Sequence, residues 1–317
     1  MWARLLEQHH IDVRTSPCEP RDGGLFFSCL GTVIPGPCES VLLSGFRSAV
    51  KLRAGGMVFD TSGDFVRATV GSVSVRVDTT EELQILEEIY LDGTYHFELR
   101  APLLIVDIGM NAAYTALYFA AMHPEAVVCA YEPFAPTFRC AEANIALNPA
   151  LQKRIRSYHF GLSDADRTMD IEYTDRWRGS VGVYGVPAGL RISNEVKIER
   201  CKFHDAAAEL GKLYNEYPDR RVVLKVDCEG SEYAVLSRLA ERAMLDRIDL
   251  MMIECHRRAS EHDPGAFRAS LSAQGFGCVH LKPDSPDISM LYAFRAIKAP
   301  QIEPELASRR IVSDILR

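Results

Sequence analysis

The chain has 317 residues, 47% of them hydrophobic, so it is long enough to bury a full core in one large domain or two small ones. Its 36 basic and 43 acidic residues give a formal net charge of −7, which does not support binding to nucleic acid or anionic membranes. No apolar run reaches the roughly 18 residues of a membrane span. Charge enters too early for a signal peptide, so we expect a cytoplasmic protein.

The N-terminal part of the chain is expected to form a small region that contains β-structure. Residues 1–56 carry several prolines and glycine pairs without a sustained period, and only a short helix at 40–52 is indicated there. At 57–77 β-branched residues alternate around glycine turns, which predicts a small antiparallel meander. A helix follows at 80–91, with Thr79 or Thr80 as its N-cap.

The next stretch predicts a buried parallel strand that turns sharply into a helix. Four apolar residues at 103–106 precede Asp107, Gly109 and Asn111, and a run without proline or glycine follows at 112–122. In open α/β sheets, ligands bind outside the carboxyl ends of the strands. A dinucleotide fingerprint would carry three glycines here. With one glycine and a carboxylate, the turn instead suits a ligand with ammonium or sulfonium charge, such as S-adenosylmethionine.

Strands and helices then alternate, which predicts parallel βαβ units. The expected strands lie at 126–131, 155–160, 222–227, 248–254, 277–282 and 288–294, and the expected helices lie at 136–147, 205–213, 231–243 and 264–274. The last two strands are expected to be antiparallel because a turn-rich segment joins them. Residues 165–204 interrupt the alternation with two β-like runs around a glycine-rich loop, a natural place for substrate contacts.

Polar side chains recur at the ends of successive predicted strands. They are, in chain order, Asp107, Glu132, Asp164, Asp227 with Glu229, and Glu254 with His256. A single acid at a strand end is more often a helix cap or a solvated turn residue, so the repetition is the stronger signal. At such positions Glu132 suits the hydroxyls of a ribose, and Asp164 suits an adenine amino group.

Five segments of the chain resemble, in order and spacing, the FkbM-type S-adenosylmethionine-dependent methyltransferases. They are residues 106–111, residues 131–133 with 144–148, residues 161–164, residues 224–232 and residues 252–254. The most specific of them contains the pattern Lys-x-Asp-x-Glu-Gly-x-Glu. The resemblance covers about residues 84–295 and implies an α/β fold, a seven-stranded, mostly parallel, Rossmann-like class I methyltransferase sheet. We therefore divide the chain into an N-terminal region (1–79), a methyltransferase domain (80–298) and a C-terminal tail (299–317).

The resemblance also implies roles for single residues in binding the cofactor. Asp107, Gly109 and Asn111 would line the methionine end of S-adenosylmethionine, Glu132 would hold the ribose, and Asp164 the adenine. The family usually has glycine where this chain has Ala113. We expect alanine to be tolerated at that position, since it still allows a helix to start.

For chemistry, O-methyl transfer needs a positioned hydroxyl and usually a base near the donor methyl group. Asp227 is the preferred base, with His256 and Glu229 as alternatives. Glu229 could also merely shape a turn, and His256 could be a surface residue. Asp227, Glu229, Glu254 and His256 could instead bind magnesium or manganese, but a metal is not favoured.

The sequence thus predicts O-methylation of a hydroxyl on a sugar or a natural-product small molecule. The expected partner is that small-molecule or carbohydrate acceptor, with no nucleic acid and no membrane, and assembly into a homo-oligomer is left open. Two alternatives remain. One is a nicotinamide-dependent oxidoreductase, which the missing phosphate turn disfavours. The other is a catalytically silent methyltransferase-like binding protein.

Overall fold

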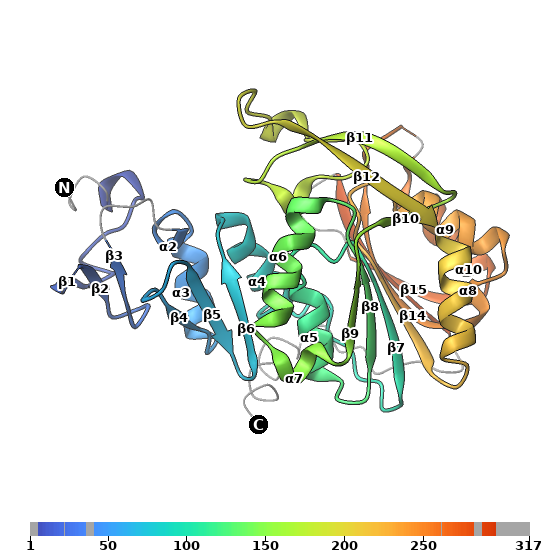
Figure 1. The fold of residues 1–317 in the computed structure, drawn as a ribbon, viewed down its shortest axis with the longest axis horizontal. Coiled ribbons are helices and arrows are strands. Elements are labelled where there is room, and N and C mark those ends of the chain that lie inside the picture. Colours follow the sequence, from blue (N-terminus) through green and yellow to red (C-terminus); the bar gives the residue numbers. More distant parts are fainter. Residues whose placement is uncertain (1–5, 22, 36–40, 261, 282–286, 296–317) are drawn as a thin grey trace. The chain divides into compact units, whose positions relative to one another are not determined.

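The structure is a computed structural model that describes residues 6–21, 23–35, 41–260, 262–281 and 287–295 (Figure 1). The described residues form two compact units. One contains the residues up to His96 together with Ala146–Asn148, and the other contains Phe97–Ile145 and the residues from Pro149 onward. The predicted boundary lay between residues 79 and 80, and the predicted tail at 299–317 falls outside the described residues.

The first unit contains two small antiparallel sheets and short helices. Its elements are β1 (Cys18–Arg21), β2 (Gly24–Phe27), β3 (Thr32–Pro35), α2 (Val41–Ser44), α3 (Phe46–Ala54), β4 (Val58–Asp60), β5 (Val66–Val70), β6 (Val73–Val77) and α4 (Thr80–Tyr90). The sheets have the orders β1-β2-β3 and β4-β5-β6. The second sheet is the predicted meander. Helix α4 begins at a capping box, in which Thr79 accepts a hydrogen bond from the backbone N–H of Glu82.

Two features of the first unit differ from the prediction. The sheet β1-β2-β3 was not predicted, because strands of four residues are too short to show a period. The helix expected at 40–52 is two helices separated at Gly45. A Cβ atom at Gly45 would lie 2.5 Å from the Leu83 side chain, so a glycine allows the close approach of α4.

The second unit is built on a seven-stranded sheet, as predicted. In spatial order its strands are β15 (Phe276–Leu281), β16 (Ile288–Arg295), β14 (Ile248–His256), β13 (Arg221–Val226), β7 (Leu103–Ile108), β8 (Val127–Tyr131) and β9 (Ile155–Tyr158). Strands β14, β13, β7, β8 and β9 pair in parallel. Strand β16 is antiparallel to both of its neighbours, so the predicted antiparallel final pair is confirmed.

Helices cover both faces of this sheet (Figure 1). On one face lie α5 (Tyr114–Met122), α6 (Ala135–Ala146) and α7 (Pro149–Gln152), and on the other lie α8 (Ala206–Glu216), α9 (Glu232–Glu241) and α10 (Pro264–Ala273). The sheet is therefore Rossmann-like, with strands buried from both sides. None of the described helices is long and apolar enough to cross a membrane.

Residues 161–205 leave the central sheet and form a smaller one. Strands β10 (Gly161–Ser163), β12 (Lys197–Asp205) and β11 (Arg167–Tyr173) lie in this order, with two short 3-10 helices, η1 (Arg178–Ser180) and η2 (Ala188–Leu190), in the loop between β11 and β12. The two predicted β-like runs are confirmed. The strand predicted at 155–160 ends at Tyr158, and the next strand pairs with β12 instead of β8.

The register of the central strands brings the predicted polar residues to one edge. Asp107 of β7 lies opposite Lys225 of β13 and Ala130 of β8. Because these strands are parallel, the residues that follow them, including Gly109, Glu132 and Asp227, emerge at the same carboxyl edge of the sheet.

Candidate active site

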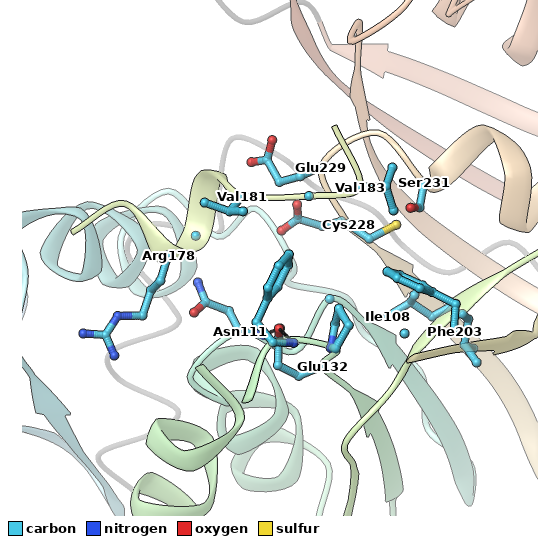
Figure 2. A pocket seen from close by; sticks show the side chains of 18 residues that line it. Ile108, Asn111, Glu132, Arg178, Val181, Val183, Phe203, Cys228, Glu229 and Ser231 are labelled. Atoms are coloured by element: carbon cyan, nitrogen blue, oxygen red, sulfur yellow. Dashed lines mark hydrogen bonds between the residues drawn. The ribbon is translucent and has the colours of Figure 1, made fainter. Parts of the chain in front are cut away.

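A cavity lies at the carboxyl ends of β7, β8 and β13 (Figure 2). It holds about 550 Å³ of empty space, which includes part of its open mouth. Strand β7 is first and β13 fourth in the chain order of the central sheet, and their successors lie on opposite sides, so the cavity occupies the topological switch point. The residues that line it are Ile108, Gly109, Asn111, Glu132, Pro133, Phe134, Gly161, Leu162, Arg178, Gly179, Val181, Gly182, Val183, Phe203, Asp227, Cys228, Glu229 and Ser231.

A buried lysine joins β7 to β13 next to the cavity. Lys225 Nζ donates a hydrogen bond to the Gly109 carbonyl oxygen (2.6 Å) and lies 3.1 Å from Asp107 Oδ1 and 3.4 Å from Asp227 Oδ2. Burial would lower the pKa of Lys225, but the two carboxylates outweigh it and raise that pKa, so the ammonium stays charged. Lys225 was not among the predicted site residues.

Asp107 is fully buried and is not among the lining residues. Its Oδ2 accepts a hydrogen bond from the Thr115 hydroxyl (2.6 Å), while Oδ1 faces Lys225. The carboxylate thus fixes the turn that carries Gly109 and Asn111. Its contact with a cofactor stays a prediction.

Gly109 must be glycine in this structure. Its φ of +83° is in the left-handed region, and a Cβ atom would lie 1.7 Å from the Asp227 carbonyl oxygen. No side chain fits there without moving one of the two strand ends. Gly109 therefore lets the turns after β7 and β13 approach each other at the cavity.

Ala113 lies in a left-handed conformation (φ 66°, ψ 21°) immediately before α5. Helix α5 begins directly after this alanine, as expected, but left-handed backbone costs an alanine roughly 1–2 kcal/mol. A glycine at this position avoids that cost, which explains physically why it suits the turn. Asn111 is also left-handed (φ 51°), as asparagine tolerates. Its Oδ1 atom is buried and has no hydrogen-bond partner among the described residues.

Glu132 occupies the end of β8 and lines the cavity (Figure 2). Its Oε2 accepts a hydrogen bond from the Asn111 backbone N–H (3.1 Å), and its Oε1 accepts one from that of Phe134 (2.9 Å). Burial raises the pKa of Glu132 to about 8, although both backbone donors lower it. Each oxygen keeps a lone pair that can accept from a ligand hydroxyl.

The three predicted catalytic residues come together at the ends of β13 and β14. Ligand-type atoms of Asp227, Glu229 and His256 all lie within 4.8 Å of one another. His256 Nε2 is 3.3 Å from Glu229 Oε1, and Arg258 pairs with the other Glu229 oxygen. Glu229 also has a left-handed backbone (φ 52°), so it shapes the turn as well as lining the cavity.

His256 is buried, so its interpretation as a surface residue is wrong. Its Nδ1 lies 2.8 Å from Oε1 of Glu232, which is fully buried and accepts hydrogen bonds from the backbone N–H groups of Cys228 and Gly230. Burial would lower the pKa of His256, but Glu229 and Glu232 hold it well above its usual range. With a carboxylate at each ring nitrogen, the imidazole is poorly suited to accept a proton at neutral pH.

The insertion between β11 and β12 contributes part of the cavity wall. A Cβ atom at Gly182 would lie 2.2 Å from the Glu229 carbonyl oxygen, so the loop packs directly on the turn that contains Glu229. Arg178 lines the cavity, but its guanidinium turns away from the other labelled residues (Figure 2). Its Nη1 donates a hydrogen bond to Cys140 Sγ (2.6 Å). Tyr184 stays 53% exposed, beside His262.

Asp164 is exposed, pairs with Arg167, and is not among the lining residues. Its predicted adenine contact remains a prediction. Lys225 and Glu232, whose charges are internal to the site, were not predicted as site residues. A lysine and a glutamate within a short motif of acids are the signals that could have indicated such a network.

The comparison with known proteins identifies the family. The sequence model of the methyltransferase FkbM domain matches residues 107–278, which is more than half of the chain. The chain belongs to the FkbM methyltransferase family. The predicted resemblance is thereby confirmed, and the cavity lies inside the matched FkbM region.

Two curated relatives are similar in sequence to part of this chain. "Methyltransferase 1" of Beauveria bassiana is 26% identical over 229 residues, which are 65% of this chain and 86% of the relative. The AMB antimetabolite synthetase AmbE of Pseudomonas aeruginosa is 25% identical over 213 residues, which are 57% of this chain and 10% of that protein. This chain therefore spans about a tenth of AmbE.

Solved structures of methyltransferases are also similar to the FkbM chain. The methyltransferase FkbM of Methylobacillus flagellatus KT is 17% identical, with a TM-score of 0.41, and the match covers 67% of this chain and 51% of that one. The N-terminal domain of human METTL16, in complex with SAH, is 12% identical with a TM-score of 0.37, and the match covers 93% of each chain.

Proposed function

We propose that this protein transfers a methyl group from S-adenosylmethionine to a hydroxyl oxygen of a sugar or a natural-product small molecule. The observation that carries the proposal is the cavity at the switch point of an FkbM-family sheet. Gly109, Asn111 and Glu132 line one part of it, and Asp227 and Glu229 line another. A donor and an acceptor could thus be bound next to each other.

The charges and backbone of the cavity support this donor over a dinucleotide. The turn after β7 has one glycine, and β7 itself carries Asp107 near its end. This turn therefore lacks the glycine-rich backbone that binds a pyrophosphate. Glu132 has acceptor capacity left for ribose hydroxyls. The carboxylate of Asp227 favours a ligand that carries ammonium and sulfonium charge.

The reaction is an in-line displacement. A lone pair of the acceptor hydroxyl attacks the methyl carbon, the carbon–sulfur bond breaks, and the sulfur leaves as the thioether of S-adenosylhomocysteine while the hydroxyl proton passes to a base. Asp227 is the base we favour, because it lines the cavity and is 25% exposed. Glu229 pairs with Arg258, and His256 lies between two carboxylates, which disfavours both as the base.

The acceptor is proposed to be a small molecule or a carbohydrate. The insertion closes part of the wall with Val181, Gly182 and Val183, which offers apolar contacts and backbone groups to such a molecule. The partial relative AmbE is an antimetabolite synthetase, which supports a natural product as the acceptor.

Mass spectrometry tests the proposal. The protein is incubated with S-adenosylmethionine and a panel of glycans and hydroxylated metabolites, and we expect an acceptor to gain one methylene unit. Asp227→Asn should bind S-adenosylhomocysteine and lose this turnover, with Asp246→Asn, an exposed aspartate paired with Arg295, as the matched control. A thermal shift with NAD in place of S-adenosylhomocysteine would support the oxidoreductase. Cofactor binding without turnover on any acceptor would support the silent binding protein.

A further inference from the structure

The cluster at the ends of β13 and β14 has the geometry of a cation site. Glu229 Oε1 and His256 Nε2 are 3.3 Å apart, and a carboxylate oxygen of Asp227 completes a group in which all three atoms lie within 4.8 Å. Two ligands about 2.1 Å from a common ion, at right angles to each other, are separated by about 3 Å. The described side chains therefore need little movement to share an ion.

A second observation concerns the orientation of His256. The imidazole is 2% exposed, and its Nδ1 lies 2.8 Å from Glu232. The backbone N–H groups of Cys228 and Gly230 donate to the oxygens of Glu232, so this carboxylate is an acceptor held in place. Histidines that bind metals usually donate their other ring N–H to such a carboxylate, which leaves the second nitrogen as the ligand. With Nδ1 at Glu232, the other ring nitrogen, Nε2, lies on the side of Glu229.

The surroundings of Nε2 also favour a cation. A lone pair on this nitrogen would face Glu229 Oε1 at 3.3 Å and Glu254 Oε1 at 4.0 Å. Lone pairs repel each other unless a proton or a metal ion lies between them. The nearby carboxylates outnumber the basic side chains Lys225 and Arg258; they are Asp107, Asp227, Glu229, Glu232 and Glu254.

We propose that Asp227, Glu229 and His256 bind one divalent cation. Two carboxylates and one imidazole form a mixed oxygen and nitrogen donor set, which suits Mn²⁺ better than Ca²⁺ or a thiolate-preferring metal. The sequence did not favour a metal, but the structure brings these side chains from both strand ends together.

Three protein ligands leave coordination positions open toward the cavity that Asp227 and Glu229 line. A cation there would bind the acceptor oxygen and make its proton easier to lose. This catalytic role rests on the proposed methyl transfer, whereas binding of the cation does not. Asp227 would then be a ligand of the cation instead of the base, and the hydroxyl proton would pass to a solvent water at the open mouth of the cavity.

The first test uses the metal-free full chain and Mn²⁺ alone. Electron paramagnetic resonance of free Mn²⁺ should show one ion bound per chain. Electron spin echo spectra of the bound ion should show coupling to a directly bound imidazole nitrogen. Absence of saturable binding, or a bound ion without nitrogen coupling, would overturn the proposal. Because both measurements use the wild-type chain and no methyl donor, they stand whether or not methyl transfer is found.

The second test uses matched variants. Glu229→Gln should weaken Mn²⁺ binding at least about tenfold, and Glu232→Gln, which acts through His256, should weaken it by roughly 10–100-fold. Glu241→Gln changes an exposed glutamate paired with Arg238 and should bind like the wild type. Unchanged affinity in Glu229→Gln would place the ion elsewhere and contradict the proposal.

Discussion

Replacing Lys225 with methionine tests the buried ion pairs and the hydrogen bond by which this lysine connects the neighbouring strands β7 and β13. The substitution keeps an unbranched side chain of similar length and removes the charge. Asp107 then remains fully buried with the Thr115 hydroxyl as its main remaining donor. The Gly109 carbonyl oxygen also loses its 2.6 Å hydrogen bond, so the turn at the cavity should loosen.

The expected loss can be worked from the geometry. Two unit charges 3.1 Å apart attract each other by roughly 5 kcal/mol at an effective dielectric constant of about 20. Desolvation offsets part of this attraction, and removing one partner of a buried pair costs about 3–5 kcal/mol. We therefore expect Lys225→Met to lower the free energy of unfolding by about 3–5 kcal/mol. In Lys225→Met/Asp107→Asn, where both charges are gone, about 2 kcal/mol should return.

Urea unfolding followed by circular dichroism measures this loss, with a check that the m-value is unchanged. The matched control is Lys212→Met, which removes a 69% exposed lysine from its pair with Glu209 and should change stability by less than about 0.5 kcal/mol. A loss below about 1 kcal/mol in Lys225→Met, or a double variant less stable than the single one, would refute the reasoning.

Three further predictions concern backbone strain and pH. Ala113→Gly removes a left-handed alanine and should raise the free energy of unfolding by about 0.5–1 kcal/mol in urea titrations, whereas a decrease would show that no strain is stored there. Burial raises the pKa of Glu132 from its usual 4.5 to about 8. The contribution of Glu132 to the free energy of unfolding is therefore fully present below pH 4.5 and is lost as the pH rises from 4.5 to 8. The fall in unfolding free energy over this range should be shallower in Glu132→Gln, and equal slopes would contradict the assignment. Hydrogen bonds from Arg238 lower the pKa of Asp205 to about 2, so its contribution is present above 3.8 and lost as the pH falls toward 2. Asp205→Ala removes this ion pair and the N-cap of α8, so it should lower the free energy of unfolding by about 1 kcal/mol at neutral pH. Thermal unfolding should show a smaller loss at the acid end, where Asp205 is protonated in the wild type.

The fold of the second unit could be predicted because buried parallel strands leave strong apolar runs in the sequence. Strands such as β7, with every residue buried, alternate with helices of regular period. The carboxyl edge of a parallel sheet then determines where Glu132 and Asp227 must meet. The small sheet at 18–35 was not predicted, because strands of four residues are too short to show an alternation of apolar and polar side chains.

The ion pairs and hydrogen bonds within the site could not be predicted in the same way. Sequence spacing places Asp107 and Lys225 at strand ends, but only the register shows that they face each other across β7 and β13. The pairing of Glu232 with His256 likewise depends on side-chain direction, which sequence spacing does not give. The left-handed backbone of Ala113 shows only in the turn geometry, because alanine is usually a helix former.

Calorimetric titration with S-adenosylhomocysteine tests the central claim, that the cavity at the switch point binds a methyl donor. The account predicts one binding site per chain, with affinity that falls at least about tenfold, or 1.4 kcal/mol, in Glu132→Ala and is retained in Asp227→Asn. It also predicts no comparable binding of NAD. Absence of S-adenosylhomocysteine binding to the wild type, or an unchanged affinity in Glu132→Ala, would contradict it.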